Sequence, residues 1–145
     1  MVTGMPPLGC EPYLLASFPG GPGDYDPATG CNTRLNDLAK LHNRALEQML
    51  LKLQVTHRGS SLIYADVYSP IIRIVASPPT YEFGDRPLAA CCGGGGGKYN
   101  FNFTTFCGVP ASTVCSDPSK SVFWDGIHFT EAANRFLARA VLASH

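Results

Sequence analysis

Residues 61–67, Ser-Leu-Ile-Tyr-Ala-Asp-Val, form a nearly continuous apolar run of strand length. Such a run is typical of a parallel strand that is covered on both faces. The strongest helical pattern of the chain, at residues 32–53, comes just before it, and Ser69-Pro70 supplies an N-cap and a first-turn proline for a helix after it. Helix, strand and helix in this order predict part of an α/β protein with a parallel sheet.

The helix at residues 32–53 carries an apolar stripe that we expect to face the core. His42 lies on this stripe, and its neighbours one turn away are Leu38 and Leu46, which offer no ligand or catalytic partner. We therefore interpret His42 as a hydrogen-bonded core residue. The stripe consists of Leu35, Leu38, His42, Ala45, Leu46, Met49, Leu50 and Leu53.

The remaining segments are shorter or irregular. Residues 1–3 are expected to end a buried strand, and residues 10–31 and 80–120 to be loops rich in proline or glycine. Asp66 ends the apolar run, and we expect it to cap the following turn. Thr130 is expected to cap a last helix whose inner face has Phe136, Leu137, Ala140 and Val141.

Charge and hydropathy exclude several classes of partner. The chain has 11 basic and 11 acidic residues of 145, and neither sign forms a block, which argues against nucleic acid or an anionic membrane surface. No apolar run approaches the roughly 20 residues of a membrane-spanning helix. The glycine run at residues 93–97 fails as a phosphate-binding loop, because Cys92 and Tyr99 stand where glycine and a hydroxyl residue are needed. We expect no cofactor.

The cysteines and one sequon indicate a secretory environment. Six cysteines are an even number, and Asn102-Phe103-Thr104 is a glycosylation sequon, which makes Asn102 the candidate glycosylation site. The N-terminal residues nevertheless have neither the basic nor the apolar region of a signal peptide. We resolve this contradiction by expecting residues 1–145 to be the C-terminal part of a longer, secreted protein.

The cysteine spacing favours disulfides over zinc. Structural zinc sites usually show paired Cys-x-x-Cys spacing, which is missing here. Cys10 and Cys31 flank one proline- and glycine-rich loop, and we expect them to be bonded. The other four cysteines cluster around a second loop, and their connectivity stays open; they are Cys91, Cys92, Cys107 and Cys115.

Asp125 and His128 are the candidate catalytic residues. An acid and an imidazole three residues apart, with Gly126 between them, suit a hydrolase in which the carboxylate orients the general base. Phe123 and Trp124 can anchor the segment in the core, and the helix from Thr130 holds it at the other end. A polar turn with an exposed histidine is the alternative, which the flanking residues disfavour.

The string Trp-Asp-Gly-Ile-His-Phe-Thr-Glu-Ala-Ala, residues 124–133, resembles the last conserved block of plant GDSL esterases/lipases, which are SGNH hydrolases. Residues 2–10, 30–43 and 91–118 are also similar to segments of this family. Glu82 departs from the pattern, since glycine is usual there. The resemblance implies the C-terminal portion of a flavodoxin-like three-layer α/β sandwich, and one partial domain over residues 1–145.

The resemblance also implies an ester hydrolase with a Ser-His-Asp triad, acting on small-molecule or lipid esters. This chain supplies the acid and base, but it has no Gly-Asp-Ser nucleophile block. Residues 34–37, Arg-Leu-Asn-Asp, imitate the Gly-x-Asn-Asp oxyanion block of the family, yet they lie inside a predicted helix. We therefore expect this chain to be inactive alone. The alternative is a non-catalytic remnant or an interaction protein.

Overall fold

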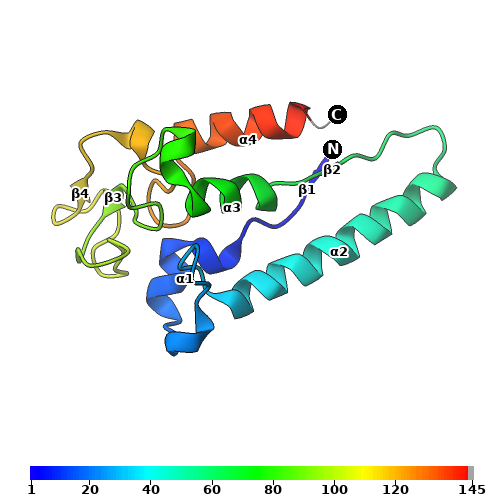
Figure 1. The fold of residues 1–145 in the computed structure, drawn as a ribbon. Coiled ribbons are helices and arrows are strands. Elements are labelled where there is room, and N and C mark those ends of the chain that lie inside the picture. Colours follow the sequence, from blue (N-terminus) through cyan, green and yellow to red (C-terminus); the bar gives the residue numbers. More distant parts are fainter. Residues whose placement is uncertain (144–145) are drawn as a thin grey trace.

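The computed structural model describes residues 1–143 and shows a mixed helical protein with a small parallel sheet. Figure 1 shows the order of the elements along the chain. The α-helices and strands are β1 (Val2–Thr3), α1 (Pro12–Ser17), α2 (Thr33–Thr56), β2 (Tyr64–Ala65), α3 (Tyr68–Ala76), β3 (Cys92–Gly93), β4 (Thr113–Val114) and α4 (Glu131–Ala143). The 3₁₀ helices are η1 (Leu8–Cys10), η2 (Pro22–Asp24), η3 (Pro78–Tyr81) and η4 (Pro118–Lys120).

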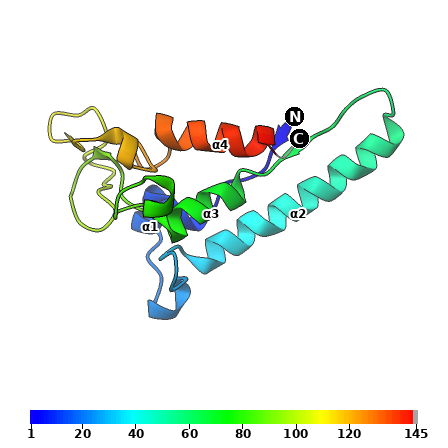
Figure 2. The same cartoon turned by 45° about the horizontal axis from the view of Figure 1, so that its top comes forward.

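The parallel pair of β1 and β2 confirms the predicted parallel sheet in part, because both strands are only two residues long. Val2 of β1 lies opposite Tyr64 of β2, and α2 is the helical crossover that joins them. In Figures 1 and 2, α3 and α4 lie side by side, while α2 extends away from them as a long arm. The strand expected at residues 61–67 is limited to Tyr64–Ala65, and Ala65 alone in that run is buried, so the run is not covered on both faces. Thr3 is exposed, so the prediction that residues 1–3 end a buried strand is also wrong.

Helix α2 is where we predicted it, but a different face is buried. Asn32 caps it by accepting a hydrogen bond from the Leu35 N–H at 3.1 Å. The buried side includes Asn36 and Asn43, and these amides bind the segment that follows β1. Asn36 Oδ1 accepts from the Gly9 N–H at 2.9 Å, and Asn43 Oδ1 accepts from the Met5 N–H at 2.6 Å.

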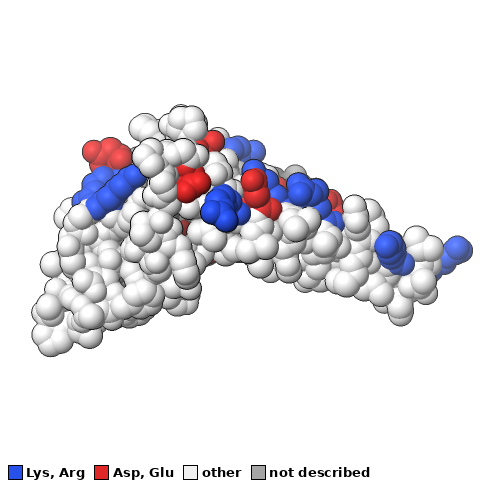
Figure 3. Space-filling model, turned by 90° about the horizontal axis from the view of Figure 1, so that it is seen from below, with Lys and Arg blue, Asp and Glu red and all other residues white. Residues whose placement is uncertain are grey.

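Much of the predicted apolar stripe of α2 is therefore exposed. Leu38 and Leu41 are 55% and 59% exposed, and His42 is exposed as well, so its assignment as a core histidine is wrong. The physical reason is that no element among residues 1–143 packs over this face. Seen from below, charged side chains follow one edge of the arm formed by α2 and leave most of the surface turned to the viewer uncharged (Figure 3).

The predictions for the turn after β2 and for residues 10–31 are confirmed only in part. Asp66 Oδ1 accepts hydrogen bonds from the N–H groups of Tyr68 and Ser69, which confirms its capping role. The helix begins at Tyr68 rather than after Ser69, because Asp66 supplies the cap that we assigned to Ser69. Residues 10–31 also differ from the expected loop, since they include α1 and η2.

The core lies between α1, α3, α4 and the segment that leads into α4. Phe123 and Val122 are fully buried in it, whereas Trp124 is only half-buried, so the predicted anchoring of the Asp125–His128 segment is confirmed for Phe123 and not for Trp124. Each such buried apolar side chain stabilises the fold by roughly 2 kcal/mol relative to exposure. The cluster comprises Cys10, Leu15, Cys31, Ile71, Ile74, Val75, Phe83, Leu88, Val122, Phe123, Ala133 and Leu137.

The structure pairs all six cysteines, which lie within the described residues. Cys10 is bonded to Cys31, the pair that flanks the first loop, with their Cα atoms 4.5 Å apart. In the second cluster, Cys91 joins Cys115 and Cys92 joins Cys107. Closing loops of these lengths stabilises a fold by about 3 kcal/mol each in the chain-entropy model.

Glu82 adopts a left-handed backbone conformation, with φ +64°, at the end of η3. This conformation costs a residue with a Cβ atom about 1 kcal/mol or more relative to glycine. We expect Glu82→Gly to stabilise the protein by about 1 kcal/mol, measured as a higher urea midpoint. Glu47→Gly is the control at an exposed position inside α2, where the same change should destabilise by a similar amount. A lower midpoint for Glu82→Gly would contradict the prediction.

Candidate active site

Asp125 and His128 lie in a tight turn between the core and α4, within residues 121–130, which we call the acid–base loop. The two sides of the turn are bonded together: the Trp124 N–H donates to the His128 carbonyl at 2.7 Å, and the Thr130 N–H donates to the Val122 carbonyl at 2.9 Å. Thr130 Oγ1 also accepts from the Ala133 N–H at 3.2 Å, which confirms its role as the cap of α4. The loop is thus fixed at both ends.

Gly126 makes the turn possible for two reasons. Its φ is +96°, a region that favours glycine, and the ring of Phe101 lies directly against its Cα. A Cβ atom at this position would lie 2.5 Å from Phe101 Cδ2, so no other residue fits. On the same turn, the Gly126 carbonyl accepts a hydrogen bond from the Tyr13 N–H at 3.1 Å, which ties the loop to the start of α1.

The Asp125 carboxylate receives three hydrogen bonds within this turn. Oδ1 accepts from the N–H groups of Ile127 and His128 at 3.0 and 2.8 Å, and Oδ2 lies 2.8 Å from His128 Nδ1. Partial burial alone would raise the pKa of Asp125, but the hydrogen bonds from His128 and Ile127 outweigh it and lower the pKa below its ordinary value. Asp125 therefore stays ionised and holds the Nδ1–H tautomer of the imidazole, which leaves Nε2 as the acceptor.

His128 presents its imidazole to solvent. Its side chain is 73% exposed, whereas that of Asp125 is only 12% exposed. Within residues 1–143, His128 Nε2 has no hydrogen bond, so the nitrogen that would accept a proton is free to meet another group. A partly buried carboxylate bonded to the Nδ1 side of an exposed imidazole is the arrangement in which serine hydrolases hold their general base.

The candidate nucleophile and oxyanion segments are not at this site. Ser60 and Ser61 lie exposed beyond the end of α2, as expected for a turn. Residues 34–37 lie inside α2, where the Asn36 amide is buried against Gly9 and cannot serve as an oxyanion donor. The described residues contain no cluster of three or more His, Cys, Asp or Glu side chains able to hold a metal ion. Likewise, no helix in residues 1–143 is long and apolar enough to cross a membrane.

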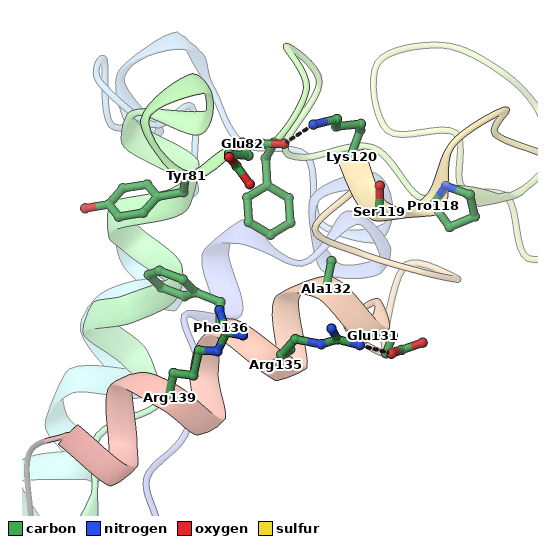
Figure 4. Close-up of a pocket in the computed structure, with 11 residues that line it drawn as sticks. Tyr81, Glu82, Pro118, Ser119, Lys120, Glu131, Ala132, Arg135, Phe136 and Arg139 are labelled. Carbon is green, nitrogen blue, oxygen red and sulfur yellow. Dashed lines mark hydrogen bonds and ion pairs between the residues drawn. The ribbon is translucent and has the colours of Figure 1, made fainter.

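A separate cleft of about 460 Å³ lies between η3, η4 and α4 (Figure 4). Tyr81 and Phe136 form an aromatic wall with ring centroids 5.1 Å apart, and Lys120 Nζ donates to the Glu82 carbonyl at 3.0 Å. Neither Asp125 nor His128 lines this cleft, so it is not part of the acid–base site.

Glu11 is a titratable residue near the site that sequence reasoning missed. It is 8% exposed and lies between η1 and α1, two residues before the N–H that binds Gly126. Burial raises its pKa from 4.5 to about 7. Its position between a cysteine and a proline gave no signal of burial, because the segment was predicted to be a loop.

The raised pKa of Glu11 predicts a pH-dependent stability. The folded protein binds the Glu11 proton more tightly than the unfolded chain does. The contribution of protonated Glu11 to the free energy of unfolding is therefore fully present below pH 4.5 and is lost as the pH rises to about 7. The loss is on the order of 3 kcal/mol, and we expect it to be absent in Glu11→Gln. Free energies of unfolding from urea curves between pH 4.5 and 8 measure the difference. Glu47→Gln, at an exposed position, is the control. An unchanged pH profile in Glu11→Gln would contradict the assignment.

Comparison with known proteins defines the family. The sequence profile of the GDSL-like lipase/acylhydrolase family matches residues 1–141. The chain therefore belongs to the GDSL lipase/acylhydrolase family, as the resemblance of its last block predicted. Its relatives include the GDSL esterase/lipase At2g27360 of Arabidopsis thaliana, which is 43% identical over 143 residues. They also include the sinapine esterase of Brassica napus, which is 40% identical over 143 residues.

These alignments cover 98% of this chain but only 36% of each relative. A third relative, the GDSL esterase/lipase At5g45910 of Arabidopsis thaliana, is 43% identical over 144 residues, which are 99% of this chain and 39% of the relative. The chain thus spans little more than a third of the length of the curated relatives that it matches.

Proposed function

We propose that residues 1–145 are the C-terminal part of a single GDSL-type ester hydrolase domain and supply the acid and base of its Ser-His-Asp triad. The observation that carries the proposal is the 2.8 Å contact between Asp125 Oδ2 and His128 Nδ1, with the second ring nitrogen exposed. The family membership supports the reaction class, and the missing Gly-Asp-Ser block supports the partial domain.

The fold that we propose for the complete domain is a flavodoxin-like three-layer α/β sandwich. A parallel sheet is normally buried on both faces and has more than two strands, so β1 and β2 represent a fraction of it. The acid–base loop also lies beside the chain that follows the carboxyl end of β1, through the Tyr13–Gly126 hydrogen bond. Active sites of parallel α/β sheets lie at this end of the strands.

The mechanism assigns one role to each residue. His128 Nε2 takes the proton of the serine hydroxyl as its oxygen attacks the ester carbonyl, and Asp125 stabilises the imidazolium that forms. The imidazolium then gives this proton to the alcohol oxygen as the ester bond breaks. The alcohol departs, and the acyl group remains bonded to the serine. In the second half, His128 Nε2 takes a proton from the water that attacks the acyl carbonyl, the acyl–serine bond breaks, and the imidazolium returns that proton to the serine oxygen as the acid leaves. The substrates would be small-molecule or lipid esters, and the chemistry requires no metal or organic cofactor.

A hybrid enzyme tests the proposal. In it, residues 1–145 replace the matched segment of the Arabidopsis relative At2g27360, to which they are 43% identical over 143 residues. We expect the hybrid to hydrolyse a short-chain nitrophenyl ester within about tenfold of the unaltered relative, because the triad would be complete. A folded hybrid without esterase activity would refute the proposal.

The second candidate is a non-catalytic remnant that acts through contacts with a partner. The exposed apolar side chains of α2 favour it, since contiguous exposed apolar surface marks interaction sites. The hybrid separates the two candidates, because a remnant whose acid–base pair has no catalytic role would leave the hybrid inactive while it still folds.

Secretion is part of the proposal and predicts a modification. Asn102 is exposed, and its Oδ1 accepts from the Thr104 N–H and Oγ1 at 2.9 and 2.8 Å, which leaves Nδ2 available for a glycan. We expect the protein from a eukaryotic secretory host to carry an N-glycan that Asn102→Gln removes. Intact mass before and after glycosidase treatment measures it, and an unmodified mass would contradict the prediction.

A further inference from the structure

Two adjacent cysteines lie against the acid–base loop immediately before Asp125. The Cys91 N–H donates to the Phe123 carbonyl at 3.0 Å, and the Cys92 N–H donates to the Trp124 carbonyl at 2.6 Å. Trp124 is the residue directly before Asp125, and its own N–H closes the turn on the His128 carbonyl at 2.7 Å. The backbone of the two cysteines thus holds the segment that leads directly into Asp125.

Each of these cysteines is bonded to a different part of the second loop. Cys91 is joined to Cys115, whose N–H also donates to the Cys91 carbonyl at 2.8 Å. Cys92 is joined to Cys107, and Cys91 and Cys92 are only 2% and 3% exposed. Their backbone is therefore held by cross-links on both sides and has little freedom to move away from the acid–base loop.

The loop closed by the Cys92–Cys107 bond makes a second contact with the acid–base loop, through a side chain. Phe101 lies within this loop and packs against Gly126, where a Cβ atom would be only 2.5 Å from its ring. Phe101 is itself packed edge to face against Tyr13 and Phe106, with ring centroids 6.0 and 5.9 Å apart. The acid–base turn is thus held between the Cys92 backbone and the Phe101 ring.

We propose that Cys91 and Cys92 are positioning residues: their disulfides to Cys115 and Cys107 hold the acid–base loop in the conformation that joins Asp125 to His128. The assignment rests on the proposed function for its meaning in catalysis, but its geometry can be tested in this chain without any reaction. The His128 imidazole is exposed to solvent, so the alignment of the Asp125–His128 pair depends on the contacts that Cys91, Cys92 and Phe101 make with the acid–base loop.

The consequence can be followed in the hydrogen bonds of Asp125. Its carboxylate accepts from the Ile127 and His128 N–H groups only while residues 124–128 keep their tight turn. These bonds lower the pKa of Asp125 against the effect of its burial, so a loosened turn would let that pKa rise. Amide exchange at Ile127 and His128 reports the same event independently.

The experiment removes each disulfide of the second loop in turn from the full chain. In Cys92→Ser/Cys107→Ser and in Cys91→Ser/Cys115→Ser, we expect the Asp125 carboxyl pKa, followed by ¹³C NMR, to rise toward its ordinary value. We also expect the Ile127 and His128 amides to exchange faster by about tenfold or more. Amide protection of α2 in the same samples shows that the fold persists.

Cys10→Ser/Cys31→Ser is the comparison variant. It opens a loop of similar length whose backbone bond to residues 121–130 is the one from the Tyr13 N–H to the Gly126 carbonyl, separate from the Cys91 and Cys92 bonds that precede Asp125. It should change both readouts of the turn much less than either variant of the second loop. The proposal is overturned if the two variants of the second loop keep the Asp125 pKa and amide exchange of the wild type, or if the comparison variant changes them equally. Loss of α2 protection in both variants would also overturn it, since the disulfides would then hold the whole fold rather than this turn.

Discussion

We expect His128→Ala to lower the turnover of the hybrid enzyme about a million-fold. In the proposed mechanism the imidazole takes the serine proton, and loss of the general base in a serine hydrolase triad has an effect of this size. Asp125→Asn should cost about 10⁴-fold, because the amide would favour the wrong imidazole tautomer. Turnover of a nitrophenyl ester, measured under substrate saturation, gives both numbers.

Folding should be almost unaffected by the same substitution. The His128 side chain is 73% exposed and makes its one described side-chain bond to Asp125, so its removal leaves the core intact. His42→Ala is the matched control, because His42 is also exposed but lies on α2, away from the acid–base loop. Full activity of His128→Ala, or an equal loss in His42→Ala, would contradict the assignment of the general base.

The chain of residues 1–145 alone should show no measurable serine-esterase activity. Its sequence lacks both the nucleophile block and the oxyanion block of the family. Absence of the nucleophile costs roughly six orders of magnitude in turnover, and each missing oxyanion donor costs about 3 kcal/mol more. The remaining Asp125–His128 pair can offer only weak general-base hydrolysis, close to that of free imidazole.

A nitrophenyl ester assay of the purified chain measures this, with and without a serine-directed inhibitor. The expected background is insensitive to the inhibitor. Inhibitor-sensitive turnover that disappears in His128→Ala would show that a serine in this chain acts as the nucleophile, and it would overturn the prediction. The outcome is independent of the hybrid experiment, since the hybrid tests the acid and base and this assay tests the missing nucleophile.

The local features of the candidate site could be predicted from sequence. Asp125 was expected to orient the His128 imidazole with Gly126 between them, and the structure has the Asp125 Oδ2–His128 Nδ1 contact at 2.8 Å with φ +96° at the glycine. Thr130 was expected to cap α4, and it does. Interactions within about four residues depend on backbone torsions and side-chain length, and both are properties of a short string of residues.

Contacts between distant segments could not be predicted in this way. Phe101 covers Gly126 from 25 positions away, and the backbone of Cys92 holds Trp124, although residues 80–120 looked irregular. Glu11 was expected in a proline- and glycine-rich loop but is buried, and its pKa is raised to about 7. No periodic pattern marks such contacts, because loops fastened by disulfides take their shape from the cross-links rather than from a repeating backbone structure.

Helix α2 separates the two kinds of information most clearly. Apolar spacing and the cap at Asn32 determined that a long helix forms there and where it begins. Only the tertiary structure decided which face is buried: the amides of Asn36 and Asn43 bind the chain after β1, while Leu38 and Leu41 stay exposed. Helical periodicity sets the direction of side chains relative to one another, but burial depends on which other segments are present to cover them.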